Sequence, residues 1–137
     1  MCMLRGIVFI IAYSICEWLW LSNTVGIYAK NAQTIMGGSK IRPTFGLPGV
    51  AAYVVLYTAV YYFVIKPINN KSAWLQDIFV PSTLLALAIY GVYNWTSMTL
   101  FPMYSKKIAI IDIAWGVFAV NLVAFIVYMC VKTRLVS

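Results

Sequence analysis

The chain has 137 residues, of which 64% are hydrophobic and 9% are charged, and its mean hydropathy is +0.89. A soluble domain of ordinary composition has about 25% charged residues. The composition therefore excludes a water-soluble globular protein and indicates a single integral membrane domain over residues 1–137. Ten basic residues against three acidic ones give a net charge of +7. Because these cations lie between apolar segments, we expect membrane lipids as partners and no nucleic acid.

Histidine is missing altogether, and the three cysteines, Cys2, Cys16 and Cys130, have no metal-ligand spacing. This composition excludes a histidine-based zinc or catalytic site, and we expect neither a metal nor a cofactor. No nucleophile motif assigns a catalytic residue, so the sequence leaves open whether the protein is an enzyme. Any proton chemistry would have to use carboxylates or tyrosines.

Four apolar segments are long enough to cross a bilayer core of about 30 Å, which takes roughly 20 helical residues. They are residues 4–25, which can extend to Ala29, and residues 46–65, 75–100 and 108–131. Backbone polar groups in lipid must be satisfied internally, so these segments are helices rather than strands. The first segment has no cleavage signal and is therefore predicted to be retained. The expected fold is all-α, a multi-pass bundle of four transmembrane helices.

Three polar links connect these segments: Lys30–Phe45, which has room for a short interfacial helix over residues 27–36, then Lys66–Ala73 and Phe101–Lys107. Basic residues divide evenly between the two sides of the membrane, so the positive-inside rule does not decide the orientation. One side has Arg5, Lys66, Lys71, Lys132 and Arg134, and the other has Lys30, Lys40, Arg42, Lys106 and Lys107. We place both termini in the cytoplasm.

Polar residues from three helices are predicted to converge in one leaflet. Counted at 1.5 Å per residue, Asp112 lies roughly 7–8 Å inside from Lys107, and Asn94 lies roughly 12 Å inside from Pro102 on the same side. Glu17, near the middle of its segment, is expected in the same half of the bilayer. An intramembrane acid costs about 2.5–3.5 kcal/mol at the helix centre and normally faces the bundle interior.

An acid followed three residues later by tryptophan occurs twice, at Glu17–Trp20 and at Asp112–Trp115. This spacing puts the two side chains on one helix face. In one interpretation the tryptophans belong to an interfacial belt and the acids hold helices together. In the other, these side chains line a polar pocket or pathway. The candidate cluster consists of Glu17, Trp20, Tyr93, Asn94, Thr96, Asp112 and Trp115.

Two further polar patterns are assigned to packing. Tyr53, Tyr57 and Tyr61 recur every four residues and form a stripe on one face of the second helix. We favour helix packing for this stripe over a wall that lines a ligand. Asn121 lies about 180° around the fourth helix from Asp112, so it is expected to bond a neighbouring helix or protomer.

The same residues carry a resemblance that covers nearly the whole chain. It combines Glu17 with Trp20-Leu21, then Tyr93-Asn94-x-Thr96, then Asp112-x-x-Trp115-Gly116. Together they resemble a family of small four-helix bacterial and viral membrane proteins that is defined only as a domain of unknown function. This chain departs from the family in having Glu where relatives tend to have Asp, and Ser97 where they have Asn.

The resemblance implies the four-helix fold and points to the same polar cluster. Because bacterial relatives look to be encoded beside lipid-modifying enzymes, it also implies a lipid-related role. The abundance of Ile, Tyr and Asn is typical of a viral or AT-rich version.

Three hypotheses for function follow. The first is a site for a lipid or small apolar ligand, for binding or for assisting lipid modification. Asp112 and Glu17 would then orient a polar headgroup or act as acid and base. The second is an ion or proton channel formed by a homo-oligomer, because rings of acids select cations. The third is a structural or assembly protein whose acids only join helices.

Overall fold

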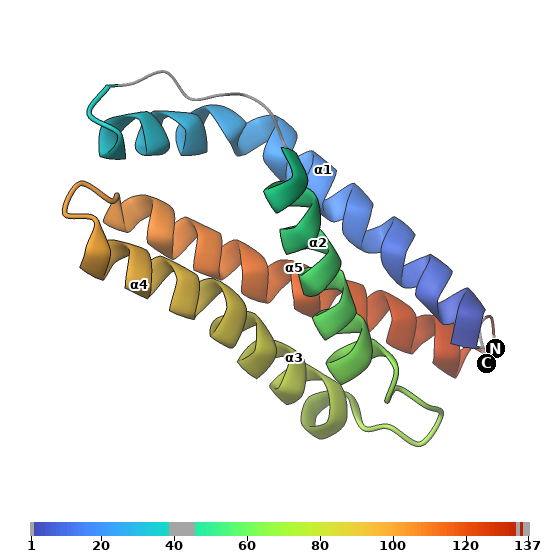
Figure 1. Ribbon diagram of the computed structural model, residues 1–137. Coiled ribbons are helices and arrows are strands. Elements are labelled where there is room, and N and C mark those ends of the chain that lie inside the picture. The colour runs from blue at the N-terminus through green and yellow to red at the C-terminus, as the bar shows by residue number, and fades with distance from the viewer. Residues whose placement is uncertain (1, 39–45, 134, 136–137) are drawn as a thin grey trace.

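The structure is a computed structural model, and it describes residues 2–38, 46–133 and 135. In chain order its elements are α1 (Cys2–Ile35), α2 (Gly46–Val60), the π-helical turns η1 (Tyr61–Ile65) and η2 (Trp74–Phe79), α3 (Val80–Ala86), the π-helical turn η3 (Leu87–Gly91), α4 (Val92–Leu100) and α5 (Lys106–Lys132). Figure 1 shows these elements as a bundle, with the start of α1 and the end of α5 at the same end.

Within the described residues, the elements join into four helices that are long and apolar enough to cross a membrane. These are Met3–Ile35, Gly46–Ile65, Trp74–Leu100 and Lys106–Lys132. The predicted all-α bundle of four transmembrane helices is therefore confirmed, and the last three ranges agree with the predicted ones to within two residues at each end.

The first helix is longer than the sequence pattern indicated. It continues to Ile35, so residues 27–36 belong almost entirely to α1 and do not form a separate interfacial helix. At 1.5 Å per residue, its 34 residues measure about 51 Å, well beyond a bilayer core of about 30 Å. Gly37 and Gly38 then adopt positive φ angles of 64° and 85° and end the helix. Residues 39–45 of this link, and Arg134, lie outside the described residues.

A bend in α1 separates its membrane-spanning part from this extension (Figure 1). Three consecutive polar side chains, Ser22, Asn23 and Thr24, donate to the backbone carbonyls of Leu19 and Trp20 at 2.7–3.0 Å. Such bonds back to the preceding turn compete with the helical ladder and bend helices. Beyond the bend, the extension turns towards the start of α5, where Asn31 Oδ1 accepts a hydrogen bond from the Ser105 backbone N–H at 3.0 Å.

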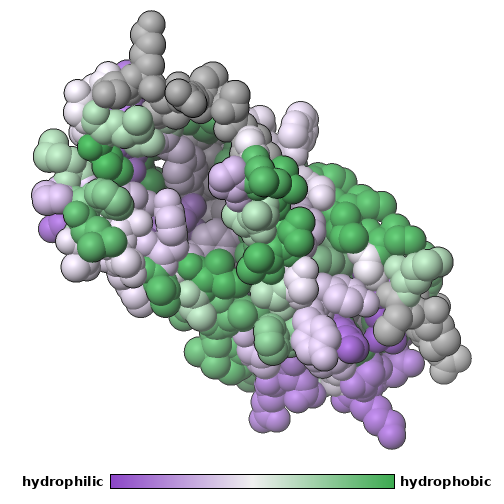
Figure 2. Space-filling view, viewed as in Figure 1, coloured by the Kyte–Doolittle hydropathy of each residue, from purple (hydrophilic) through white to green (hydrophobic). Residues whose placement is uncertain are grey.

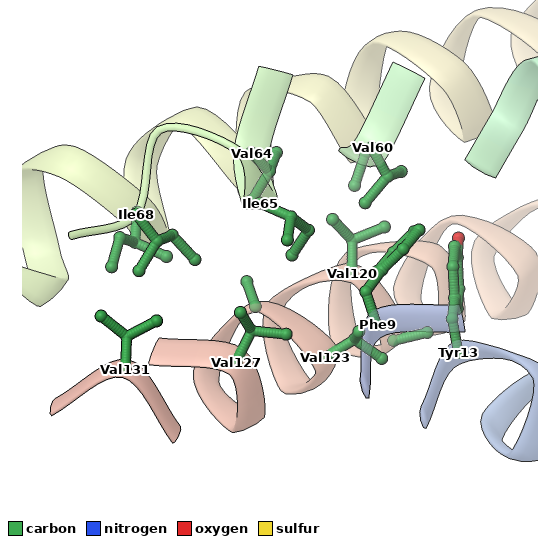
Figure 3. Packing of buried hydrophobic residues seen from close by; sticks show 14 residues of the cluster. Phe9, Tyr13, Val60, Val64, Ile65, Ile68, Val120, Val123, Val127 and Val131 are labelled. Carbon is green, nitrogen blue, oxygen red and sulfur yellow. The ribbon is translucent and has the colours of Figure 1, made fainter. Parts of the chain in front are cut away.

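The cluster of buried hydrophobic side chains lies towards the end of the bundle that contains the start of α1 and the end of α5 (Figure 3). Small and β-branched side chains from α2, η1 and α5 interlock there with two aromatic rings of α1. We call this region the packed end. Its labelled members are Phe9, Tyr13, Val60, Val64, Ile65, Ile68, Val120, Val123, Val127 and Val131. All of them are at most 3% exposed.

One polar group is built into the bundle near this end. Asn121 donates from Nδ2 to Thr83 Oγ1 at 3.0 Å and accepts from Ser82 Oγ at 2.5 Å. Both partners belong to α3, so the expectation that Asn121 bonds a neighbouring helix is confirmed. In lipid such bonds between helices average about 0.6 kcal/mol each.

Outside these contacts the bundle is covered with apolar side chains (Figure 2). On α2, for example, Leu47 is 82% exposed and Val55 is 68% exposed. An apolar surface of this extent is untenable in water and suits contact with lipid tails. Hydrophilic side chains gather instead around the Lys66–Ala73 turn, at one end of the molecule.

Candidate functional site

A cavity of about 500 Å³ lies away from the packed end, between the bend of α1, the first half of α2, the η3–α4 junction and α5. We call it the acid–aromatic cavity. Figure 2 shows the surface hollowed there, beside α2, with pale purple rather than green lining the hollow. Its lining residues are Glu17, Trp20, Leu21, Tyr28, Ala52, Tyr53, Leu56, Ile89, Tyr90, Tyr93, Asp112 and Trp115.

Glu17 is the acid contributed by α1, and its side chain is only 8% exposed. Its Oε1 accepts a hydrogen bond from the indole nitrogen of Trp115 at 3.2 Å. Its Oε2 accepts from the hydroxyl of Tyr53 at 3.3 Å. Both partners come from other helices, so this carboxylate joins α1 to α5 and to α2.

Asp112 is the acid contributed by α5, and it is half-buried. Its Oδ1 accepts from the Tyr28 hydroxyl and its Oδ2 from the Asn94 side-chain amide, both at 2.6 Å. Tyr28 lies in the extension of α1 beyond the bend, whereas Asn94 lies on α4. This carboxylate therefore holds the extension against the rest of the bundle.

The two acid–tryptophan patterns exchange partners across the cavity. Trp115, which follows Asp112 in the chain, donates to the other acid, Glu17. Trp20, which follows Glu17, donates to the Tyr28 hydroxyl at 3.3 Å, and that hydroxyl in turn donates to Asp112. The two indole rings are parallel to within 3° and their centroids are 4.4 Å apart. The tryptophan of each pattern thus helps to position the acid of the other pattern. The two stacked indoles form part of the cavity wall.

Behind Asp112, Asn94 is fully buried and its amide has a defined orientation. The Tyr104 hydroxyl donates to Asn94 Oδ1 at 2.8 Å, which leaves Nδ2 for Asp112 and for the backbone carbonyl of Tyr90. Burial, with smaller contributions from Tyr93 and Asp112, raises the pKa of Tyr104 to about 12. Tyr104 therefore keeps its proton at neutral pH and remains the donor.

Gly116 explains the last position of the Asp-x-x-Trp-Gly pattern. A Cβ atom at this position would lie 2.2–2.5 Å from three ring carbons of Tyr90. Only a residue without a side chain lets the Tyr90 ring lie against α5. The Tyr90 hydroxyl is 3.2 Å from that of Tyr13, so this ring also connects the cavity to the packed end.

Most of the residues expected from the sequence come together here. Glu17, Trp20, Tyr93, Asp112 and Trp115 line the cavity, and Asn94 bonds to Asp112 behind it. Thr96 does not belong to the cluster: it is exposed and lies outside the cavity. The reason is helical geometry, because Thr96 follows Asn94 by two residues and so points about 200° away from it. Ser97, three residues after Asn94, is the buried neighbour.

The sequence reading missed four tyrosines of the site: Tyr28, Tyr53, Tyr90 and Tyr104. Tyr53 had been grouped with Tyr57 and Tyr61 in a packing stripe. For the other two members, the packing assignment agrees with the structure, since their rings lie 5.6 and 5.9 Å from that of Phe9. Tyr53 alone reaches the cavity. Tyr53 and Glu17 are 36 residues apart on different helices, so no local sequence pattern predicts their contact.

Comparison with known proteins identifies a family for this chain. No curated protein and no solved structure matches the chain. A family described as "Predicted membrane protein (DUF2177)", a domain of unknown function, matches residues 3–129, which is nearly the whole chain. The resemblance drawn from the three residue patterns is thereby confirmed, and the protein belongs to this family of membrane proteins.

Proposed function

We propose that the acid–aromatic cavity binds a membrane lipid or a small apolar ligand, and that the protein serves as a lipid-binding or accessory protein in lipid modification. One observation carries this proposal: a cavity within an apolar bundle is lined both by two carboxylates and by aliphatic side chains. The aliphatic residues are Leu21, Ala52, Leu56 and Ile89. A ligand with a polar part and an apolar part matches such a lining.

The position of the cavity supports a ligand that arrives from the membrane. Figure 1 is viewed across the helices, and the hollow in Figure 2 opens towards the viewer. The opening therefore lies on the side of the bundle, which faces lipid, rather than at its ends. At 1.5 Å per residue, Asp112 is about 9 Å from the start of α5, close to the level of lipid headgroups.

A pore shared between several copies is supported less well. Both carboxylates point into their own bundle, where side chains of neighbouring helices donate hydrogen bonds to them. A ring of acids that selects ions would instead have to face a common axis. The arrangement favours a site that is complete within one chain.

A substitution that fills the cavity tests the proposal, and the chain offers a matched control. Ala52 lines the cavity, whereas the adjacent Ala51 is also exposed on α2 but lies outside it. We expect Ala52→Trp to reduce lipid retention about tenfold, as judged by native mass spectrometry in mild detergent, which corresponds to about 1.4 kcal/mol. Ala51→Trp should retain lipid like the wild type.

Equal lipid retention in all three proteins would contradict the proposal. Cation or proton flux in liposomes that is lost in Glu17→Gln would then favour the pore instead.

A further inference from the structure

The geometry points to a positively charged ammonium group as the part of the lipid that the acid–aromatic cavity recognises. This inference rests on the proposed function and deepens it, because it names the headgroup class. The relevant lipids are those with a choline or ethanolamine head. Three features of the cavity carry the inference: the charge of its polar wall, its aromatic side chains and the location of the lysines.

The polar wall holds two carboxylates whose four donors are all uncharged: an indole, two phenols and a carboxamide. Neutral donors orient a carboxylate and stabilise its charge, but they do not neutralise it. Among the residues that the structure describes, no lysine or arginine lines the cavity. Since intramembrane acids pair with a partner of opposite charge where one is available, a cationic ligand completes this site.

Aromatic side chains supply the rest of the enclosure. Two indoles and four phenol rings line the cavity: Trp20, Trp115, Tyr28, Tyr53, Tyr90 and Tyr93. Cations are attracted to the faces of such rings, and cages of aromatic residues recognise quaternary ammonium groups. An uncharged apolar headgroup would use the rings but would leave the carboxylates without a counter-ion.

The chain uses the same pairing elsewhere with its own cations. The Lys66 ammonium lies 4.4 Å from the ring centroid of Tyr62, and that of Lys132 lies 5.3 Å from the ring of Tyr128. Both pairs are at the packed end, where the lysine and the ring belong to the same chain. In the acid–aromatic cavity the described lining has rings and acids but no lysine, which leaves a place for the cation of a ligand.

Exposed lysines occur at the cavity's end of the bundle, where they suit the phosphate of the same lipid. Lys30 lies in the extension of α1, and Lys106 and Lys107 lie at the start of α5. The net charge of +7 would by itself favour anionic lipids over the whole surface. The cavity is therefore expected to prefer lipids with an ammonium group, whereas the rest of the protein surface prefers anionic lipids. The test can distinguish the two because their preferences are opposite.

The test compares two lipids that differ only in the headgroup. Wild-type protein in mild detergent is offered equal amounts of phosphatidylcholine and phosphatidylglycerol with identical acyl chains, and bound lipid is identified by native mass spectrometry. Lipid in the cavity is the part that Ala52→Trp removes and Ala51→Trp retains. We expect the cavity to hold phosphatidylcholine about tenfold more often than phosphatidylglycerol.

The double variant Glu17→Gln/Asp112→Asn separates charge from shape. In each acid one of the two partners is a tyrosine hydroxyl, which can reverse its hydrogen bond and accept from the new amide. The variant should therefore fold, but it should hold less cavity lipid than the wild type, and in the lipid that remains its preference for phosphatidylcholine should fall to about the level of its other lipid contacts. An unchanged preference in this variant would overturn the inference.

The remaining outcomes are distinguishable. Cavity lipid without any headgroup preference in the wild type overturns the ammonium inference and leaves the proposed function standing. The absence both of lipid that depends on Ala52 and of choline binding overturns both. Binding of millimolar choline chloride by wild-type protein that holds no cavity lipid would show that a water-soluble ammonium compound, rather than a lipid, is the ligand, and would overturn the lipid source.

Discussion

The two ends of the bundle hold the same helices together in different ways. At the packed end, Val64, Val123 and Val127 interlock and leave little room between α5 and η1. At the other end, indole and phenol side chains bridge the helices and enclose about 500 Å³. The difference teaches that side-chain size sets the distance between helices in lipid, where close packing rather than water exclusion drives association. Long polar aromatic side chains hold helices in place without closing the gap.

Substitution of Gly116 by alanine should have the largest effect, because it acts where the two ends meet. The added Cβ atom would be 2.2 Å from the Tyr90 ring, so the ring or α5 must move. Overpacking of this kind costs about 3 kcal/mol at the upper end of its usual range. Thermal unfolding in detergent measures the loss.

Gly26→Ala is the control for this substitution, since nothing lies within 4 Å of the position and the helix should gain up to about 1 kcal/mol. Equal stabilities of the two variants would refute the close approach of Tyr90 to α5.

Truncation of Ile65 tests the packed end itself. Its side chain is fully buried in η1, and Ile65→Ala should leave a void. Lipid is as apolar as the protein interior, so the loss of stability comes only from the lost packing contacts. We therefore expect Ile65→Ala to lower the stability by about 2 kcal/mol, at the low end of the range for such truncations. Ile11→Ala, at a position 55% exposed on α1, should be nearly neutral in the same unfolding assay. Lipid retention should be unchanged in both variants, and a loss in Ile65→Ala would show that the two ends are not separable.

The smallest expected loss of stability comes from removing an asparagine, either beside the acid–aromatic cavity or near the packed end. Asn94→Ala and Asn121→Ala each remove an amide that makes three hydrogen bonds. Each should cost about 1 kcal/mol of stability, near the usual value for polar contacts in lipid. Asn94→Ala alone should also weaken lipid retention, because it releases Asp112. If Asn121→Ala weakened lipid retention equally, the lipid site would not be confined to the acid–aromatic cavity.

The sequence was sufficient for those features that depend on local pattern. The number of spans and most of their ends follow from apolar length, and both acids were placed on one side by counting residues from the helix ends. The continuation of α1 to Ile35 was missed because a polar stretch after Tyr28 looks the same whether it coils or stays helical. Partners such as Tyr53 for Glu17 depend on how separate helices are oriented, which no spacing encodes. Thr96 belongs to the same motif as Asn94, but residues two positions apart on a helix face nearly opposite ways, so Thr96 points away from the cavity.

The attachment of α2 has a mechanical consequence. Its backbone contacts are made mainly through η1, which continues it. Its side-chain bonds to α1 include those of the Tyr53 hydroxyl to Glu17 and of the Tyr57 hydroxyl to Ser14, and the Tyr57 ring stacks on Tyr13. With 15 residues, α2 is about 22 Å long. α2 can therefore pivot about η1, and a tilt of about 10° there moves the Gly46 end by roughly 4 Å. Such a tilt would change the width of the cavity opening, while the buried valines in and next to η1 would keep their contacts.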